Sequence, residues 1–188
     1  MQKKMMKEEE FEQIYEAHRH DVYKLALYFT QDEYTAEDIA QKIFYKLFLH
    51  FDNVRCKENI LPYLLKMTRN MSYNWIRHRD FEYRGEYIDN MPEDRIVLES
   101  AEEHYLKKEK ELRIREFWNR VLEEMVEENE SWYNIITLIY CLGKTHEEVA
   151  EELDMTMQVL YSKFYRARRW IRKNYENEYL EIVGGKIE

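Results

Sequence analysis

Residues 36–51 read AEDIAQKIFYKLFLHF, and residues 60–79 read ILPYLLKMTRNMSYNWIRHR. In both segments the apolar side chains recur at intervals of three and four residues, the spacing that gathers them on one side of an α-helix. The apolar side of the first segment comprises Ala36, Ile39, Ala40, Ile43, Phe44, Leu47 and Phe48, and that of the second comprises Leu61, Leu64, Leu65, Thr68, Met71 and Ile76. Thr35 with Asp38 predicts a capping box before the first helix. Two consecutive amphipathic helices with a shared core are therefore predicted.

The opposite side of the second predicted helix has a different chemistry. It carries Lys66, Arg69, Asn70, Tyr73, Asn74, Trp75, Arg77 and Arg79. Cations neutralise phosphates, amides hydrogen-bond base edges and aromatic rings stack on unpaired bases, so this side is suited to binding nucleic acid. A solvated helix face with one or two aromatic rings turned into the core carries the same residue types. The choice therefore depends on the rest of the chain.

The composition favours an all-α fold. The 188 residues include only 4 Gly and 2 Pro, and polar and apolar residues seldom alternate, so strand and turn signals are weak. A third amphipathic segment, Phe11–Phe29, predicts a helix that packs with the first two. We therefore expect two small helical domains, residues 1–80 and 105–188, joined by a flexible acidic linker at residues 81–104.

Charge is segregated along the chain, whose formal net charge is −9. Residues 57–79 carry five cations and one anion, and residues 163–173 carry six cations and no anion. In contrast, residues 80–103 carry nine acids and two arginines, and residues 123–152 carry nine acids and one lysine. Because exposed charges act over roughly 8–10 Å at physiological salt, two basic patches can bind DNA locally on an otherwise acidic protein.

Residues 143–173, GKTHEEVAEELDMTMQVLYSKFYRARRWIRK, follow the pattern of a helix-turn-helix. Thr145 with Glu148 predicts a capping box that opens a short helix, Asp154-Met155-Thr156 predicts a tight turn, and a longer basic helix follows. The first turns of such a second helix enter the major groove of DNA. We expect Gln158, Tyr161, Ser162 and Tyr165 at base edges, and Lys163, Arg166, Arg168, Arg169 and Arg172 at phosphates, with Arg166 also able to reach a guanine. A generic helical hairpin with a basic face is the alternative.

Sequence signals for catalysis or metal binding are weak. His18 and His20 have no further ligands at metal-binding spacing, and residues 146–150 match only part of the HExxH zinc motif. No phosphate-binding loop or catalytic triad pattern occurs, so we expect no enzyme activity, no cofactor and no metal. The two cysteines are isolated, and no segment is apolar enough for a signal peptide or a membrane span. A cytoplasmic protein without membrane insertion is expected.

The order of these parts resembles the bacterial RNA polymerase sigma factors, specifically the two-domain extracytoplasmic-function type. Residues 36–44, AEDIAQKIF, look like the family's polymerase-binding helix, and residues 62–77 look like the helix that opens and reads the minus-ten element. Residues 143–171 look like the reader of the minus-thirty-five element. The chain departs from the family pattern at Asn74, where an acid is usual, at residues 159–161, where a Thr-Val-Lys-like run is usual, and at Asp154, where glycine is common.

The resemblance implies a role for each segment. Asp38, Gln41 and Phe44 would dock on core RNA polymerase. The separated non-template strand would be held by Asn70, Asn74, Trp75, Arg77 and Arg79. The acidic linker would thread toward the polymerase active-site channel, where its charge imitates nascent RNA. Core RNA polymerase and promoter DNA are the implied partners, an anti-sigma factor is a further partner that the resemblance allows, and the free protein is expected to be a monomer.

Two other functions fit part of the pattern. A stand-alone helix-turn-helix regulator would use the C-terminal motif and dimerise to span two half-sites. A protein-binding decoy would occupy the polymerase clamp without reading DNA. The leading prediction is a sigma factor that directs promoter recognition and transcription initiation, because only this function uses both basic segments in the order in which they occur.

Overall fold

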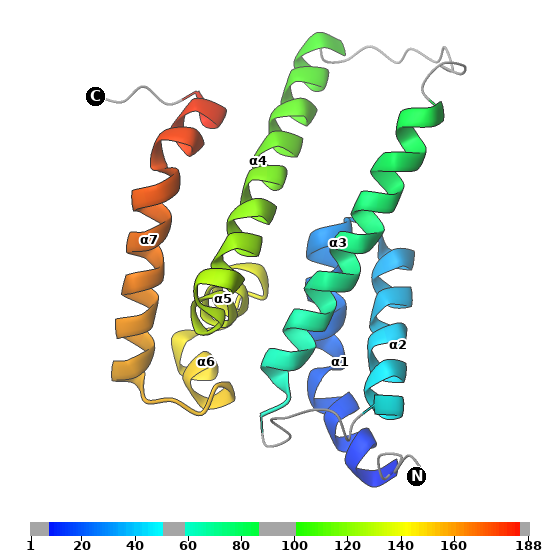
Figure 1. The fold of residues 1–188 in the computed structure, drawn as a ribbon, viewed down its shortest axis with the longest axis vertical. Coiled ribbons are helices and arrows are strands. Elements are labelled where there is room, and N and C mark those ends of the chain that lie inside the picture. The colour runs from blue at the N-terminus through cyan, green and yellow to red at the C-terminus, as the bar shows by residue number, and fades with distance from the viewer. Residues whose placement is uncertain (1–7, 51–58, 87–100, 185–188) are drawn as a thin grey trace. The chain divides into compact units, whose positions relative to one another are not determined.

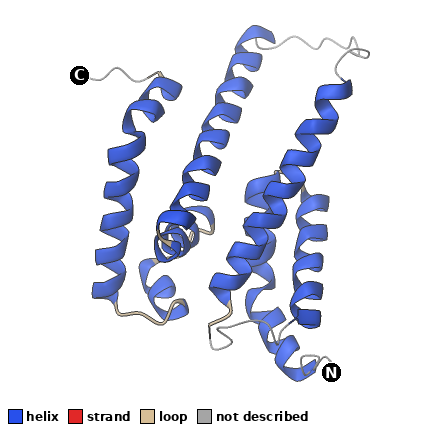
Figure 2. Cartoon of the chain, in the orientation of Figure 1, coloured by secondary structure: helices blue, strands red, loops and turns tan. Residues whose placement is uncertain are grey.

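The computed structural model describes residues 8–50, 59–86 and 101–184, and these residues are helical with short connections (Figures 1 and 2). In chain order the elements are α1 (Glu8–Thr30), α2 (Glu33–His50), α3 (Leu61–Glu86), α4 (Ala101–Glu128), α5 (Glu130–Ile136), the π-helix η2 (Thr137–Cys141), α6 (His146–Glu152) and α7 (Met157–Val183). No strand occurs in the described ranges. The predicted all-α fold is confirmed.

Helices α1, α2 and α3 pack around one apolar core (Figure 1). The fully or almost fully buried members of this core include Val22 and Ala26 of α1, Ile43 and Leu47 of α2, and Leu64 of α3. Burial of such side chains contributes roughly 1.5–3 kcal/mol each, so the amphipathic spacing of the three segments accounts for their association. At one end, the ring of Phe44 meets those of Phe11 and Tyr15 edge to face, with centroids 6.5 and 4.9 Å apart.

The start of α2 differs from its prediction. The helix begins at Glu33, two residues before Thr35, because Asp32 provides the cap: its Oδ2 accepts a hydrogen bond from the Thr35 backbone N–H at 2.8 Å. Asp38, predicted to complete a capping box with Thr35, instead pairs with Lys42, whose Nζ lies 2.5 Å from Asp38 Oδ2. The Thr35–Asp38 capping box is therefore wrong.

The helices on either side of the predicted linker are longer than expected. Helix α3 continues to Glu86 rather than ending near Arg79, and α4 begins at Ala101. Both helices thus enter the predicted linker range of 81–104, and residues 87–100 lie outside the described residues.

By internal contacts the chain divides into two compact units: unit 1 comprises residues 1–87 and 137–160, and unit 2 comprises residues 88–136 and 161–188. The sequence-based domains, 1–80 and 105–188, group residues 137–160 differently, and as functional divisions they stay a prediction.

Within unit 2, aromatic contacts, a hydrogen bond and an ion pair join α4 and α7. Phe117 of α4 lies 6.1 Å from Tyr175 and 5.7 Å from Tyr179 of α7, centroid to centroid. The Tyr175 hydroxyl donates a hydrogen bond to Glu124 Oε2 at 2.6 Å, and burial together with this bond raises the pKa of Tyr175. An ion pair between Arg120 and Glu178 adds a third contact. One side of α7 is therefore fixed by packing, which leaves the opposite side for other partners.

Candidate nucleic-acid interface

On α3, four of the predicted DNA-binding side chains form an exposed stripe. Lys66, Asn70, Asn74 and Arg77 follow one another at intervals of four, four and three residues, and all four are exposed. Because this spacing keeps them on one face of the helix, two amides lie between two cations. We call these four residues the α3 stripe.

Of three other predicted residues of α3, Arg69 is buried, and Tyr73 and Trp75 are partly buried. Arg69 is only 9% exposed, Trp75 is partly buried against the core of α1–α3, and the Tyr73 ring lies 5.4 Å from that of Phe29. Each of these residues is the direct neighbour in sequence of a stripe residue. Because one residue turns an α-helix by roughly 100°, their side chains point away from the stripe and toward α1 and α2. Arg69 is thus buried in this conformation, contrary to the prediction of a surface contact, whereas DNA binding by the partly buried Tyr73 and Trp75 stays a prediction. Arg79 lies outside the residues whose side chains are described.

Arg69 nevertheless acts on the stripe through its neighbour. Its Nε and Nη2 donate hydrogen bonds to Asn70 Oδ1 at 3.1 and 2.8 Å. With the amide oxygen held in this way, Asn70 presents its NH₂ group, a donor of two hydrogen bonds, to the outside. Arg69 is therefore a positioning residue, and Asn70 is prepared to donate to a base or a phosphate.

The predicted helix-turn-helix is present at α6 and α7. The Thr145–Glu148 capping box is confirmed: the Glu148 N–H donates to Thr145 Oγ1 at 3.2 Å, and the Thr145 N–H donates to Glu148 Oε2 at 2.8 Å. The bond to Thr145 lowers the pKa of Glu148. At the other end of α6, Asp154 has φ 49°, the Met155 N–H donates to Ala150 O and the Asp154 N–H to Glu151 O. This is a Schellman motif in which an aspartate occupies the position that favours glycine.

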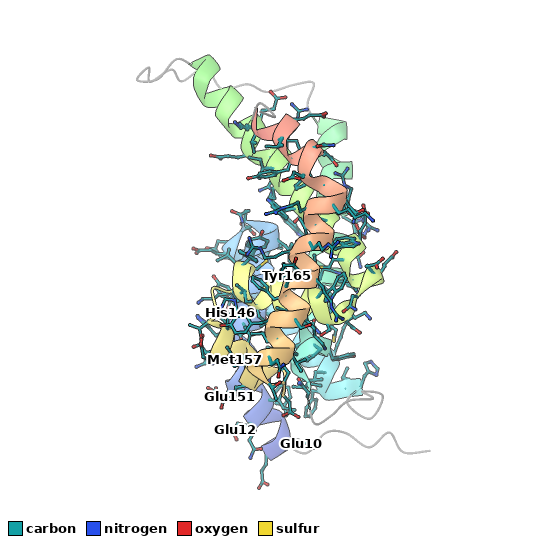
Figure 3. All side chains as sticks on the ribbon, turned by 90° about the vertical axis from the view of Figure 1, so that its left-hand side faces the viewer. Glu10, Glu12, His146, Glu151, Met157 and Tyr165 are labelled. Atoms are coloured by element: carbon teal, nitrogen blue, oxygen red, sulfur yellow. The ribbon has the colours of Figure 1, made fainter. Side chains whose placement is uncertain are left out.

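Helix α7 presents most of its predicted residues to the outside. Gln158, Tyr161, Ser162, Tyr165, Arg166 and Arg169 are all exposed, with Tyr161 at 50% and Tyr165 at 65%. Figure 3 labels Tyr165 and the start of the helix at Met157. Lys163 is the exception: it is partly buried, and its Nζ donates to Ser131 Oγ at 2.8 Å. Arg168 stacks over the Phe164 ring, with its guanidinium carbon 5.7 Å from the centroid.

The outer face of α2 divides the three predicted polymerase-binding residues. Asp38 and Gln41 are exposed, whereas Phe44 is 3% exposed and belongs to the core. The prediction that Phe44 touches a partner is thus corrected: its ring holds α2 in place. Tyr34, 88% exposed, and Tyr45, 65% exposed, share the face with Asp38 and Gln41. Sequence reasoning missed these two, although their helical register with Asp38 and Gln41 could have indicated them.

The described part of the chain offers no arrangement for metal chemistry. No group of three or more His, Cys, Asp and Glu side chains there could hold a metal ion. His18 lies near Asp21 and Lys144, and burial lowers its pKa. No helix in the described ranges combines the length and apolar character that a membrane crossing requires.

Comparison with known proteins gives three findings. Residues 14–82 match the family model of sigma-70 region 2. The chain is 21% identical over 169 residues to the extracytoplasmic-function RNA polymerase sigma factor SigM of Bacillus subtilis, an alignment that covers 87% of this chain and 94% of that protein. It also matches a structure of the sigma factor RpoE in complex with the anti-sigma factor NepR from Bartonella quintana, at 19% identity and a TM-score of 0.41, over 87% of this chain and 94% of that chain.

The region 2 match, over residues 14–82, covers most of α1, all of α2 and the α3 stripe. The similarity to an extracytoplasmic-function sigma factor extends over 87% of this chain. Such factors direct transcription initiation, with core RNA polymerase and promoter DNA as partners, and they are generally not enzymes. This similarity favours the sigma-factor prediction over a stand-alone regulator.

Proposed function

We propose that this chain uses three separate faces to initiate transcription: α2 binds core RNA polymerase, the α3 stripe holds the opened minus-ten element, and α7 reads the minus-thirty-five element. The observation that carries this proposal is the α3 stripe, in which two exposed amides lie between two exposed cations within the residues that match sigma-70 region 2. The chain would perform no covalent chemistry of its own.

The α3 stripe has the groups that an unpaired DNA strand requires. Lys66 and Arg77, at its two ends, would neutralise phosphates, while Asn70 and Asn74 would hydrogen-bond bases that have left the duplex stack. Arg69 supports this by fixing the Asn70 amide with two hydrogen bonds. The aromatic rings Tyr73 and Trp75 contribute by packing α3 against its neighbours in unit 1, so stacking on DNA bases is not assigned to them.

Helix α7 would read duplex DNA in the major groove. Near its start, Gln158 can form the two hydrogen bonds that identify adenine, and the exposed rings of Tyr161 and Tyr165 can contact thymine methyl groups. Ser162 lies among them. Lys163, Arg166 and Arg169 would bind phosphates or, for Arg166, a guanine, and Lys163 would leave Ser131 to do so.

On α2, Asp38 and Gln41 would bind the polymerase together with Tyr34 and Tyr45. Exposed tyrosines are enriched in protein interfaces, because they bury a large ring and retain a polar end. The stretch between the two DNA-binding regions, residues 81–104, would carry its acids toward the active-site channel. We assign the protein to the cytoplasm, as a monomer when free, with an anti-sigma factor as a candidate regulator.

The test is binding of polymerase, reconstituted with this protein, to a DNA fork whose minus-ten segment is single-stranded. Asn70→Ala and Asn74→Ala should each weaken binding by roughly 5- to 150-fold, the effect of losing a well-placed base contact. The matched control is Gln13→Ala, which removes an exposed amide from α1. Fork binding that is unchanged in the asparagine variants, while the polymerase complex still forms, would contradict the assignment of the α3 stripe.

A further inference from the structure

Asn70 lies in the middle of the α3 stripe, and its side-chain amide is held by a residue outside the stripe. Arg69 Nε and Nη2 both donate to Asn70 Oδ1, at 3.1 and 2.8 Å, so both lone pairs of that oxygen are engaged. A guanidinium group has only donors, and the amide atom that faces it must therefore be the oxygen. The Asn70 amide nitrogen is thus the atom turned away from Arg69.

The burial of Arg69 makes this orientation a lasting one. Arg69 is 9% exposed, whereas Asn70 is an exposed residue. A buried charge is costly unless hydrogen bonds compensate it, and hydrogen bonds from a charged donor are stronger than those between neutral groups. Turning the Asn70 amide over would replace two such bonds with a contact between donors. The orientation is therefore set by the folded helix before any ligand binds.

Asn74, one helical turn further along the stripe, differs from Asn70 in this respect. It is exposed like Asn70, but its side chain forms no hydrogen bond with any part of the chain that the structure describes. Its amide can turn over, so it can offer its oxygen and its nitrogen to the same base. The stripe therefore contains one amide that donates and accepts, at Asn74, and one that only donates, at Asn70.

DNA bases differ in whether a group that only donates can satisfy them. The usual pairing of asparagine with adenine uses both ends of the amide, because the oxygen accepts from N6 and the nitrogen donates to N7. Thymine places its N3–H donor between its two oxygens. Cytosine, with O2 and N3, and guanine, with O6 and N7, present two neighbouring acceptors. A group that only donates therefore fits cytosine and guanine, and it leaves the N6 donor of adenine without its acceptor.

We propose that Arg69 determines base specificity in the α3 stripe. By holding the Asn70 oxygen, it makes the stripe select cytosine or guanine over adenine and thymine at one position of the opened minus-ten strand. The proposal rests on the proposed function, because it specifies the base that the same stripe binds. Arg69 does not touch the base and acts through Asn70, so it is a positioning residue.

The test measures base preference as well as affinity. Polymerase reconstituted with this protein is titrated with fork DNAs that carry each of the four bases at each position of the single-stranded minus-ten segment. Asn70→Ala identifies the position that Asn70 contacts, because base preference should disappear there. In the unsubstituted protein, cytosine or guanine at that position should bind roughly 5- to 150-fold more tightly than adenine or thymine, and the series shows which of the two is selected.

Arg69→Met removes the donors and keeps a long side chain that can stay buried. The released Asn70 amide can then pair with adenine, so adenine should bind as tightly as the base selected before. Base preference at the position identified by Asn74→Ala should not change, because the Asn74 amide was never held. Met67→Ala, which removes a partly buried apolar side chain from the same helix, is the control for lost stability and should weaken binding of all four bases alike.

A measurement on the free protein keeps the proposal testable if Arg69→Met does not fold. Nuclear spin relaxation reports the order of each side-chain NH₂ group. The Asn70 group should be as ordered as rigid backbone, with an order parameter of roughly 0.85, and the Asn74 group should be mobile, with a value below roughly 0.6. Equal mobility of the two amides would overturn the proposal.

Two other results would overturn the proposal and leave the proposed function intact. One is a preference for adenine or thymine at the Asn70 position, and the other is an Arg69→Met protein that folds and keeps the original preference. The proposed function fails in a different way. If the polymerase complex forms but Asn70→Ala changes neither affinity nor base preference, the α3 stripe does not hold the minus-ten strand as assigned, and the role of Arg69 falls with it.

Discussion

Two regions proposed to bind DNA, α3 and α7, treat their polar and aromatic residues differently. On α3, Arg69 is buried, Tyr73 and Trp75 are partly buried, and four of the predicted residues form an exposed stripe. On α7, every predicted residue except Lys163 is exposed. The difference follows from packing: α3 contacts both α1 and α2, so little of its circumference is open, whereas Ala167 and Tyr175 mark one narrow buried side of α7. A helix that packs in a bundle can bind DNA only with the side chains that are not buried against its neighbours.

The largest effect expected from this contrast concerns Phe44, a predicted contact residue that lies in the core. Phe44→Ala should lower the free energy of unfolding by about 3–5 kcal/mol, because it leaves a cavity between Phe11 and Tyr15. The adjacent Tyr45→Ala should change stability by about 0.5 kcal/mol or less, since that ring is exposed. Urea unfolding measures both, and equal losses in the two variants would contradict the assignment of Phe44 to the core.

Two adjacent residues of α3, Asn74 and Trp75, are likewise expected to differ, one affecting DNA binding and the other affecting stability. Trp75→Ala should cost about 2 kcal/mol of stability, less than a fully buried tryptophan, while Asn74→Ala should cost about 0.5 kcal/mol or less. In the fork-binding assay Asn74→Ala should have the clear effect. The division of α3 fails if Asn74→Ala unfolds the protein more easily than Trp75→Ala.

On α7 we expect the opposite combination, loss of function without loss of stability. Arg166→Ala should remove about 1–3 kcal/mol of binding energy for the minus-thirty-five element. Run-off transcription from a promoter with that element should therefore fall by roughly 5- to 150-fold. Its unfolding curve should coincide with that of the unsubstituted protein. Unchanged transcription in the Arg166→Ala variant would contradict the assignment of Arg166 to the DNA interface. The control is Asn177→Ala, at an exposed site near the far end of α7.

The smallest effect concerns the turn between α6 and α7. Asp154 has φ 49° at the glycine position of a Schellman motif, so Asp154→Gly should stabilise the protein by about 0.5–1 kcal/mol. Gly143→Ala, where φ is 72°, should destabilise it by a similar amount. Thermal unfolding resolves both signs, and a less stable Asp154→Gly protein would show that the aspartate side chain contributes more than its backbone conformation costs.

The sequence was sufficient for the fold class, the three-helix core and the helix-turn-helix, because these depend on helical periodicity and local capping. Thr145 and Glu148 predicted their capping box correctly, since both partners lie within four residues. The Thr35 prediction failed because Asp32 offered a competing cap one turn earlier. Local patterns do not decide between two adjacent caps when both fit.

Contact residues were harder to predict than helices. Periodicity assigned Arg69 and Trp75 to a polar side, but the width of the buried arc depends on how many neighbours a helix has, which no local pattern records. Tyr34 and Tyr45 were missed because the sequence alone does not show that these aromatic residues are exposed on the solvent face of α2. The bond from Lys144 to Asp21 joins residues 123 positions apart, and it required the structure.

The central claim is that this chain makes core RNA polymerase start at particular promoters. The most direct test is run-off transcription with purified core polymerase, with and without the protein, over a fragment library from the source genome. The account predicts discrete new transcripts whose start sites share two upstream elements, and their loss with Asn74→Ala but not with Gln13→Ala. If the protein binds core polymerase and yields no transcript, it is a decoy; if it does not bind core polymerase, it is a regulator that acts alone. Either result would contradict the account.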